Sequence, residues 1–215
     1  KQRQSAIQGV HLVVSMLPAR FHMLCAQDCL HYGKHLVTAS YVAPELAEMH
    51  DTVATKGLTF MNEVGLDPGI DHMSAMKVIE EVKALGGTIT SFKSYTGGLI
   101  APESSDNPWG YKFTWNPRNV VLAGQGGAKY LEAGSNVEVN YQDLFRDTIK
   151  VHFEGFPELG ATRSFDGYPN RDSLGYKELY GLDDVATMIR GTLRGLGFCQ
   201  AWDVLVQLGL TDDSN

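Results

Sequence analysis

The residues best suited to chemistry are a carboxylate and several arginines that stand among turn-forming residues. Asp67 follows a short predicted strand and precedes Pro68, so it can cap a helix and can also face the amine of a ligand. Arg171 lies within Tyr-Pro-Asn-Arg-Asp-Ser, residues 168–173, where a fixed guanidinium suits two-pronged binding of a carboxylate. A structural pair with neighbouring Asp172 is the alternative interpretation of this arginine.

A second basic spot lies nearer the carboxyl terminus. Arg190 and Arg194 are four residues apart in a segment predicted to be helical, so both would lie on one face of that helix. A solvated helix face explains this pair equally well. Because the arginines stand outside charge runs in an acidic chain, together they indicate a small anionic ligand.

Other patterns count against several kinds of site. Cys25 and Cys29 share a predicted helix face but lack the paired Cys/His sets of structural zinc, so no metal site is predicted. The histidines form no His-x-x-x-His pair, and there is no Gly-x-Ser-x-Gly elbow of a serine hydrolase. The glycine-rich stretches at 97–98 and 124–127 lack the strand–turn–helix setting of a phosphate-binding loop.

The composition narrows the classes of partner and compartment. The 215 residues carry 18 Lys and Arg against 25 Asp and Glu, a net charge of −7 that argues against nucleic-acid binding. No apolar run approaches the ~20 residues that a membrane span needs. Three cysteines form no disulfide framework, so we expect a reducing, cytoplasmic location. The chain has no initiator Met and is expected to be part of a longer protein.

The elements that must position these residues change character along the chain. In the first third, strands are predicted at 11–15, 35–39 and 58–61, and helices at 21–31 and 44–56. This alternation favours a parallel βαβ arrangement, in which ligands bind at the carboxyl ends of the strands. Those ends lie at residues 15–18, 39–41 and 62–65.

The rest of the chain predicts an α+β domain, with the boundary near residues 65–70. Asp67 and Pro68 are expected to start a helix whose apolar stripe comprises Ile70, Met73, Met76, Ile79 and Val82. The other strands are predicted at 88–99, 137–139 and 149–153, and the other helices at 116–131 and 183–208, the last broken at 195–197.

Several long strings resemble the saccharopine reductase family, the NADP-dependent, glutamate-forming saccharopine dehydrogenases of lysine metabolism. The strings are residues 62–72, 95–98, 101–108, 111–115, 168–173 and 190–194. The resemblance covers essentially the whole chain in order, but only the middle of that family's chain. It implies a Rossmann-like cofactor domain, of which residues 1–68 are a remnant without its phosphate loop. Residues 69–215 would then form the α+β substrate domain, incomplete at its carboxyl end, with the active site in the cleft between the two domains.

The resemblance also implies an activity and a set of site residues. Saccharopine would be interconverted with L-glutamate and 2-aminoadipate 6-semialdehyde through an imine, with NADP(H) as cofactor and a homodimer as a possible assembly. The implied catalytic residues are Asp67 and Tyr41. The implied substrate-binding residues are Ser40, Tyr41, Asp67, Arg171, Thr192, Leu193 and Arg194. The implied cofactor-binding residues are Leu17, Pro18, Ala39, Ser40, Leu66, Asp67, Pro68 and Trp115.

One departure and two alternatives accompany this resemblance. Many members of the family have Cys where this chain has Thr96, so no thiol-dependent role carries over to that position. A related imine-reducing dehydrogenase, such as one that forms carboxynorspermidine, shares the fold and the reductive condensation. An inactive substrate-domain fragment that serves only in binding or dimerisation is the alternative from a different class.

Overall fold

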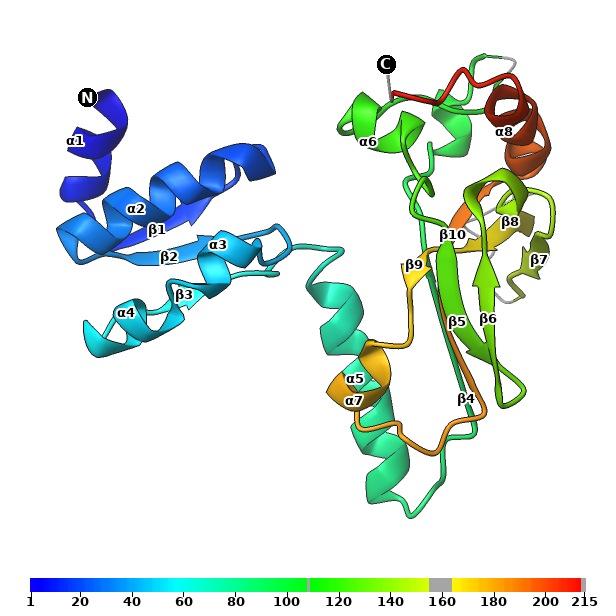
Figure 1. Cartoon of the computed structure of the whole chain (residues 1–215), viewed down its shortest axis with the longest axis horizontal. Coiled ribbons are helices and arrows are strands. Elements are labelled where there is room, and N and C mark those ends of the chain that lie inside the picture. Colours follow the sequence, from blue (N-terminus) through cyan, green and yellow to red (C-terminus); the bar gives the residue numbers. More distant parts are fainter. Residues whose placement is uncertain (108, 155–163, 214–215) are drawn as a thin grey trace. The chain divides into compact units, whose positions relative to one another are not determined.

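The computed structural model describes residues 1–107, 109–154 and 164–213. The contacts divide the chain into two compact units, Lys1–Val78 and Ile79–Asn215, which we call unit 1 and unit 2 (Figure 1). Each unit carries its own sheet, and the two are described separately. The helices among the described residues are all too short or too polar to cross a bilayer.

Unit 1 is built on a parallel sheet of three strands in the order β1-β2-β3. Its strands are β1 (Leu12–Ser15), β2 (His35–Thr38) and β3 (Phe60–Met61). Its helices are α1 (Gln2–Gln8), α2 (His22–Tyr32), α3 (Pro44–Ala47) and α4 (His50–Thr55), with a 3-10 turn at Ala19–Phe21. The structure therefore confirms the parallel βαβ arrangement, with the predicted helix at 44–56 divided in two.

The core of unit 1 lies between α2 and the sheet. Cys25, Ala26 and Cys29 on α2 pack with Leu36 of β2, and all four are buried. Burial raises the pKa of the Cys29 thiol to about 11, so this thiol stays protonated and acts as a small apolar side chain. The shared helix face of the two cysteines is thus a packing face.

Helix α5 (Ile70–Ala84) begins later than the sequence predicts. Asp67 is not its N-cap, and Pro68 is not its first residue. Instead, the Asp71 carboxylate accepts a hydrogen bond from the Gly69 backbone N–H at 2.8 Å, which satisfies a donor next to the helix start. The predicted apolar stripe is buried only in part: Ile79 is 2% exposed, whereas Ile70 is 54% exposed.

Unit 2 is built on a seven-stranded mixed sheet with a long central strand, β10 (Thr187–Gly195). The order along the sheet is β6-β5-β10-β8-β7, while β4 pairs in parallel with β10 and β9 with β5. The remaining strands are β4 (Ser91–Thr96), β5 (Ala128–Glu132), β6 (Ser135–Val139), β7 (Ile149–His152), β8 (Ser164–Pro169) and β9 (Arg171–Asp172). The predicted strands at 88–99, 137–139 and 149–153 are confirmed.

The helices of unit 2 are short, so the sheet forms most of the framework of this unit. They are α6 (Pro117–Val121), α7 (Tyr176–Leu179) and α8 (Phe198–Gln207), with 3-10 turns at Pro102–Ser104 and Tyr141–Asp143. The largest core cluster joins Trp202 and Val206 of α8 to Leu144, Phe145 and Tyr168.

The buried carboxylate of Asp166 on β8 ties three elements together. It pairs with the Lys150 ammonium of β7 and accepts hydrogen bonds from the backbone N–H groups of Gly197 at 2.9 Å and Cys199 at 3.4 Å. The side chain of Asp166 is 1% exposed. Its charge therefore lies at the N-terminus of α8, where the helix dipole favours an anion.

Two helix predictions in unit 2 are wrong in part. The helix that starts at Asn116 ends at Val121, because the chain then turns through Gly124 and Gly127, whose φ angles are 88° and 67°. The first part of the predicted helix at 183–208 is strand β10, Thr187–Gly195, whereas the part after the predicted break at 195–197 is helical, Phe198–Gln207. Arg190 and Arg194 therefore lie about 13 Å apart along a strand rather than one helical turn apart.

Candidate active site

In unit 1, the predicted catalytic residues meet at the carboxyl edge of the parallel sheet. Tyr41 follows β2 and Asp67 follows β3, and the Tyr41 hydroxyl donates a hydrogen bond to Asp67 Oδ1 at 3.0 Å. Both residues are exposed, and Tyr41 is 40% accessible. The strand ends of a doubly wound sheet are where such folds bind ligands. A carboxylate and a phenol thus face solvent at the place where chemistry is expected.

The loop that carries Tyr41 is held from the neighbouring strand end. The Glu63 backbone N–H donates to the Ser40 carbonyl at 3.0 Å, and the Glu63 carboxylate accepts from the Val42 N–H at 3.1 Å. Glu63 adopts φ 59°, a left-handed conformation that places both groups on the 40–42 loop. The backbone on both sides of Tyr41 is therefore held by hydrogen bonds to Glu63.

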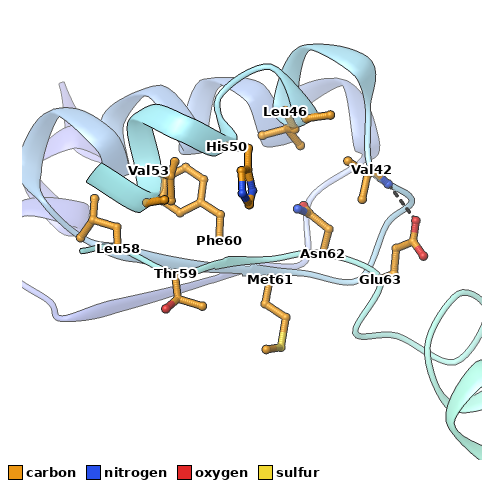
Figure 2. A pocket seen from close by; sticks show the side chains of 12 residues that line it. Val42, Leu46, His50, Val53, Leu58, Thr59, Phe60, Met61, Asn62 and Glu63 are labelled. Atoms are coloured by element: carbon orange, nitrogen blue, oxygen red, sulfur yellow. Dashed lines mark hydrogen bonds between the residues drawn. The ribbon is translucent and has the colours of Figure 1, made fainter. Parts of the chain in front are cut away.

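Figure 2 shows the Val42–Glu63 bond at one end of a cavity of about 670 Å³ beside β3 and α4. The walls of this cavity are mainly apolar side chains, such as Leu46, Val53 and Phe60. The residues predicted to bind substrate or cofactor do not line it. We therefore assign the candidate site to the sheet edge rather than to this cavity.

Ser40 lies at the same edge and is engaged from inside the protein. Its Oγ is 2.8 Å from Nε2 of His22, and Nδ1 of the same ring is 2.8 Å from Oγ of Ser15. Both Ser15 and His22 are 3% exposed. A buried chain of polar groups thus ends at a hydroxyl on the candidate site.

The predicted cofactor-binding residues of unit 1 lie around the three strand ends. Leu17 is 47% exposed and Leu66 is 72% exposed, which leaves apolar surface beside the polar pair. Pro68 is buried, and a Cβ at Gly65 would lie 2.9 Å from the carbonyl oxygen of Ala39. The loops after β2 and β3 are therefore in close contact.

In unit 2, Arg194 lies inside the molecule. It is 3% exposed, its Nη1 donates to the Gly98 carbonyl at 3.1 Å, and its guanidinium stacks over the rings of Tyr111 and Phe198 at 5.4 and 5.2 Å. A methyl group at Gly98 would lie 3.3 Å from Nε1 of Trp115 and 3.9 Å from Nη1 of Arg194. Gly98 thus lies close against both Trp115 and the guanidinium of Arg194.

Thr192 and Leu193 lie on the same strand with different surroundings. Thr192 is half-buried and pairs in register with Tyr168, whereas the Leu193 side chain is 6% exposed and belongs to the interior. Burial raises the pKa of the Tyr168 phenol, and the nearby Arg194 charge partly offsets that effect. This phenol therefore remains a neutral hydrogen-bonding group beside the guanidinium.

The two other arginines of the prediction lie in different settings. Arg171 is exposed with φ 56°, on the short strand β9 rather than in a loop, and the neighbouring Asp172 carboxylate accepts from the Leu174 N–H at 2.8 Å. Arg190 stacks on the Tyr176 ring at 4.2 Å. The arginines thus do not form one helix face.

Sequence reasoning missed two groups that support the site. His22 belongs to a set of histidines without a His-x-x-x-His pair, and Glu63 lies within the strand end at residues 62–65. A sequence signal for His22 did exist, since it follows the turn after a strand that ends in Ser15. No local pattern indicated the left-handed Glu63.

Comparisons with known proteins give a consistent result. The family described as "Saccharopine dehydrogenase C-terminal domain" matches residues 65–215. A Schizosaccharomyces pombe protein named saccharopine dehydrogenase (NADP(+), L-glutamate-forming) is 43% identical over 211 residues, 98% of this chain and 46% of that protein. The Mus musculus protein named alpha-aminoadipic semialdehyde synthase, mitochondrial, is 42% identical over 207 residues, 96% of this chain and 22% of that protein.

A solved structure agrees with these relatives. It is titled apo histidine-tagged saccharopine dehydrogenase (L-Glu forming) from Saccharomyces cerevisiae and matches with a TM-score of 0.87 at 41% identity, covering 99% of this chain and 47% of that one. The chain thus spans about half the length of the dehydrogenases that it matches. Because one relative is named as mitochondrial, the cytoplasmic location stays a prediction.

Proposed function

The chain belongs to the saccharopine dehydrogenase family, and from this premise we propose that the complete protein interconverts saccharopine with L-glutamate and 2-aminoadipate 6-semialdehyde. The observation that carries the proposal is the pair of Tyr41 and Asp67, joined at 3.0 Å on the carboxyl edge of the parallel sheet. Reductive joining of an amine and an aldehyde passes through a cationic imine, and an exposed carboxylate at a ligand-binding edge suits that cation.

In this proposal, Asp67 stabilises the positive charge on the reacting nitrogen. Tyr41 donates one hydrogen bond to Oδ1 of Asp67, which fixes the orientation of the carboxylate. Bound NADPH would supply the hydride that reduces the imine carbon. Preorganised charge of this kind lowers the barrier without reorganisation during the reaction.

The arginines of unit 2 supply what a substrate with three carboxylates requires. The guanidinium of Arg194 is fixed by Gly98 and two aromatic rings, so it is preorganised to bind a carboxylate. Arg171 and Thr192 would add an exposed cation and a hydroxyl. Because the side chain of Leu193 is in the interior, we expect its part in substrate binding to come from its backbone.

The residues proposed to border the cofactor are partly apolar and exposed, which fits a nicotinamide ring. They are Leu17, Pro18, Ala39, Ser40, Leu66, Asp67 and Pro68 in unit 1 and Trp115 in unit 2. The relatives' names specify NADP, and we propose the same cofactor for this protein.

The test is an assay of the complete protein with saccharopine and NADP+. Asp67→Asn keeps the shape of the side chain and removes its charge, so we expect kcat to fall about a hundredfold. Asp51→Asn, on an exposed position of α4, is the matched control and should retain full activity. Equal activity of Asp67→Asn and the native protein would refute the assigned role of this carboxylate.

A substrate panel separates the proposed activity from the related imine-reducing reactions. In the synthetic direction, only a glutamate-forming saccharopine dehydrogenase should require glutamate as the amine. NADPH oxidation with a diamine in place of glutamate would favour a carboxynorspermidine-type enzyme. A complete protein that binds saccharopine without turnover would favour a role in binding alone.

A further inference from the structure

The most informative group outside the proposed chemistry is the imidazole of His22. Its Nδ1 is 2.8 Å from Ser15 Oγ and its Nε2 is 2.8 Å from Ser40 Oγ, so each ring nitrogen has one hydroxyl partner. The ring is 3% exposed and stands at the first residue of α2, directly behind the strand ends. A histidine with both nitrogens engaged is held in one orientation.

The direction of the two hydrogen bonds follows from the needs of Ser15. Its hydroxyl is buried, so its proton requires an acceptor. Two acceptors lie near it: Nδ1 of His22 at 2.8 Å and the Cys25 sulfur at 3.9 Å. Because sulfur is a weak acceptor and lies far off, the proton of Ser15 points to Nδ1. The ring then carries its own proton on Nε2.

This tautomer determines what Ser40 offers to the site. Nε2–H donates to Ser40 Oγ, so the hydroxyl proton of Ser40 is not used within the chain of bonds. Burial lowers the pKa of His22, which keeps the ring neutral and leaves Nδ1 able to accept. Ser40 is half-buried, two residues after β2 and next to Tyr41, and its proton is therefore directed at the sheet edge.

We infer that His22 is a positioning residue, which holds Ser40 as an acceptor and aims its hydroxyl proton at an acceptor oxygen of the bound ligand. That oxygen belongs either to a carboxylate of the substrate or to the carboxamide of the nicotinamide. The inference rests on the proposed function, since it takes Ser40 to contact substrate or cofactor. His22 itself acts only through Ser40.

The test uses steady-state kinetics of the complete protein with four variants. His22→Ala should lower kcat/KM about tenfold, and Ser40→Ala by a similar factor, because each variant loses the aimed hydrogen bond from Ser40 to the ligand. His22→Gln retains an amide N–H near the position of Nε2 and should stay within about threefold of the native protein. In the double variant, loss of His22 should cost less than about twofold beyond Ser40→Ala.

The same data identify the ligand atom. A loss expressed in the KM for saccharopine assigns the acceptor to a substrate carboxylate. A loss expressed in the KM for NADP assigns it to the nicotinamide carboxamide. A His22→Ala defect that persists in full on the Ser40→Ala background would overturn the inference, because His22 would then act by another route.

A second measurement holds even where His22→Ala fails to fold or saccharopine is not turned over. Nitrogen NMR of histidine-labelled native protein reports the tautomer of His22 directly. A proton on Nε2 supports the inference, and a proton on Nδ1 overturns it whatever the substrate. Absence of saccharopine turnover by the native protein would instead count against the proposed function alone.

Discussion

The two units hold their charged side chains in opposite ways. In unit 1, Asp67 and Tyr41 stand on exposed loops after strand ends, and the backbone N–H and carboxylate of Glu63 hold the Tyr41 loop. In unit 2, Arg194 stands inside the central strand, 3% exposed and enclosed by aromatic rings. The side chains on the loops can be substituted without disturbing a hydrophobic core, whereas the buried Arg194 is itself part of the packed interior.

Because of this difference, we expect substitutions in the two units to affect activity and folding stability differently. Substitutions at the unit 1 edge should reduce turnover and leave folding nearly intact, because the side chains bury little surface. Substitutions of Arg194 should reduce both, because the same atoms pack the interior and bind the Gly98 carbonyl. The predictions below test that separation.

The largest effect is expected for Arg194→Ala. The change removes the hydrogen bond to Gly98, empties a buried space and leaves two aromatic rings without their cation, which together should lower the free energy of unfolding by about 3 kcal/mol. Denaturant unfolding measures this loss. Arg171→Ala, at an exposed position, is the control and should cost less than about 1 kcal/mol. Equal losses in the two variants would break the contrast between the units.

A smaller and purely functional effect is expected for Tyr41→Phe. The change removes the hydroxyl that donates to Asp67 at 3.0 Å and keeps the ring, so kcat should fall about tenfold, or 1.4 kcal/mol of transition-state stabilisation. The Tm should stay within about 2 °C, because an exposed hydrogen bond contributes little to folding. A large fall in Tm would show that the Tyr41–Asp67 pair contributes to folding stability, as Arg194 does.

The smallest effect is expected in the pH dependence of stability. Burial lowers the pKa of His22 below its usual 6.5, so the unfolded chain binds a proton more readily than the folded one. The contribution is constant above pH 6.5 and is lost as the pH falls below it. The native protein should therefore lose more stability than His22→Gln between pH 7 and 5, as measured by thermal unfolding. An identical pH dependence of the two proteins would contradict the neutral, buried ring.

The sequence predicted unit 1 far better than the centre of unit 2, for a physical reason. The strands and helices of unit 1 alternate within short stretches, so local periodicity reports them to within a few residues. Strand β10 pairs with β4, β5 and β8, whose residues lie up to about a hundred positions away. Its pattern is set by those neighbours, and a local window over 187–195 resembles a helix.

The candidate site shows the same limit. Resemblance to a family indicated Tyr41 and Asp67, but the 3.0 Å bond between residues 26 apart is visible only once the strand ends are placed. Asp67 was predicted as a helix cap, and the helix starts three residues later. The hydrogen bonds from Ser15 through His22 to Ser40 join β1, α2 and the loop after β2. No single segment of sequence contains all three residues.

The carboxylate of Asp166 has a consequence for local motion. Because it holds β7 through Lys150 and the first turn of α8 through Gly197, the start of that helix cannot fray without stranding a buried charge. The first half of β7, the middle of β8 and the beginning of α8 should therefore open as one cooperative unit. In hydrogen-exchange terms, the amide of Gly197 would report on the opening of a sheet edge rather than on a helix end.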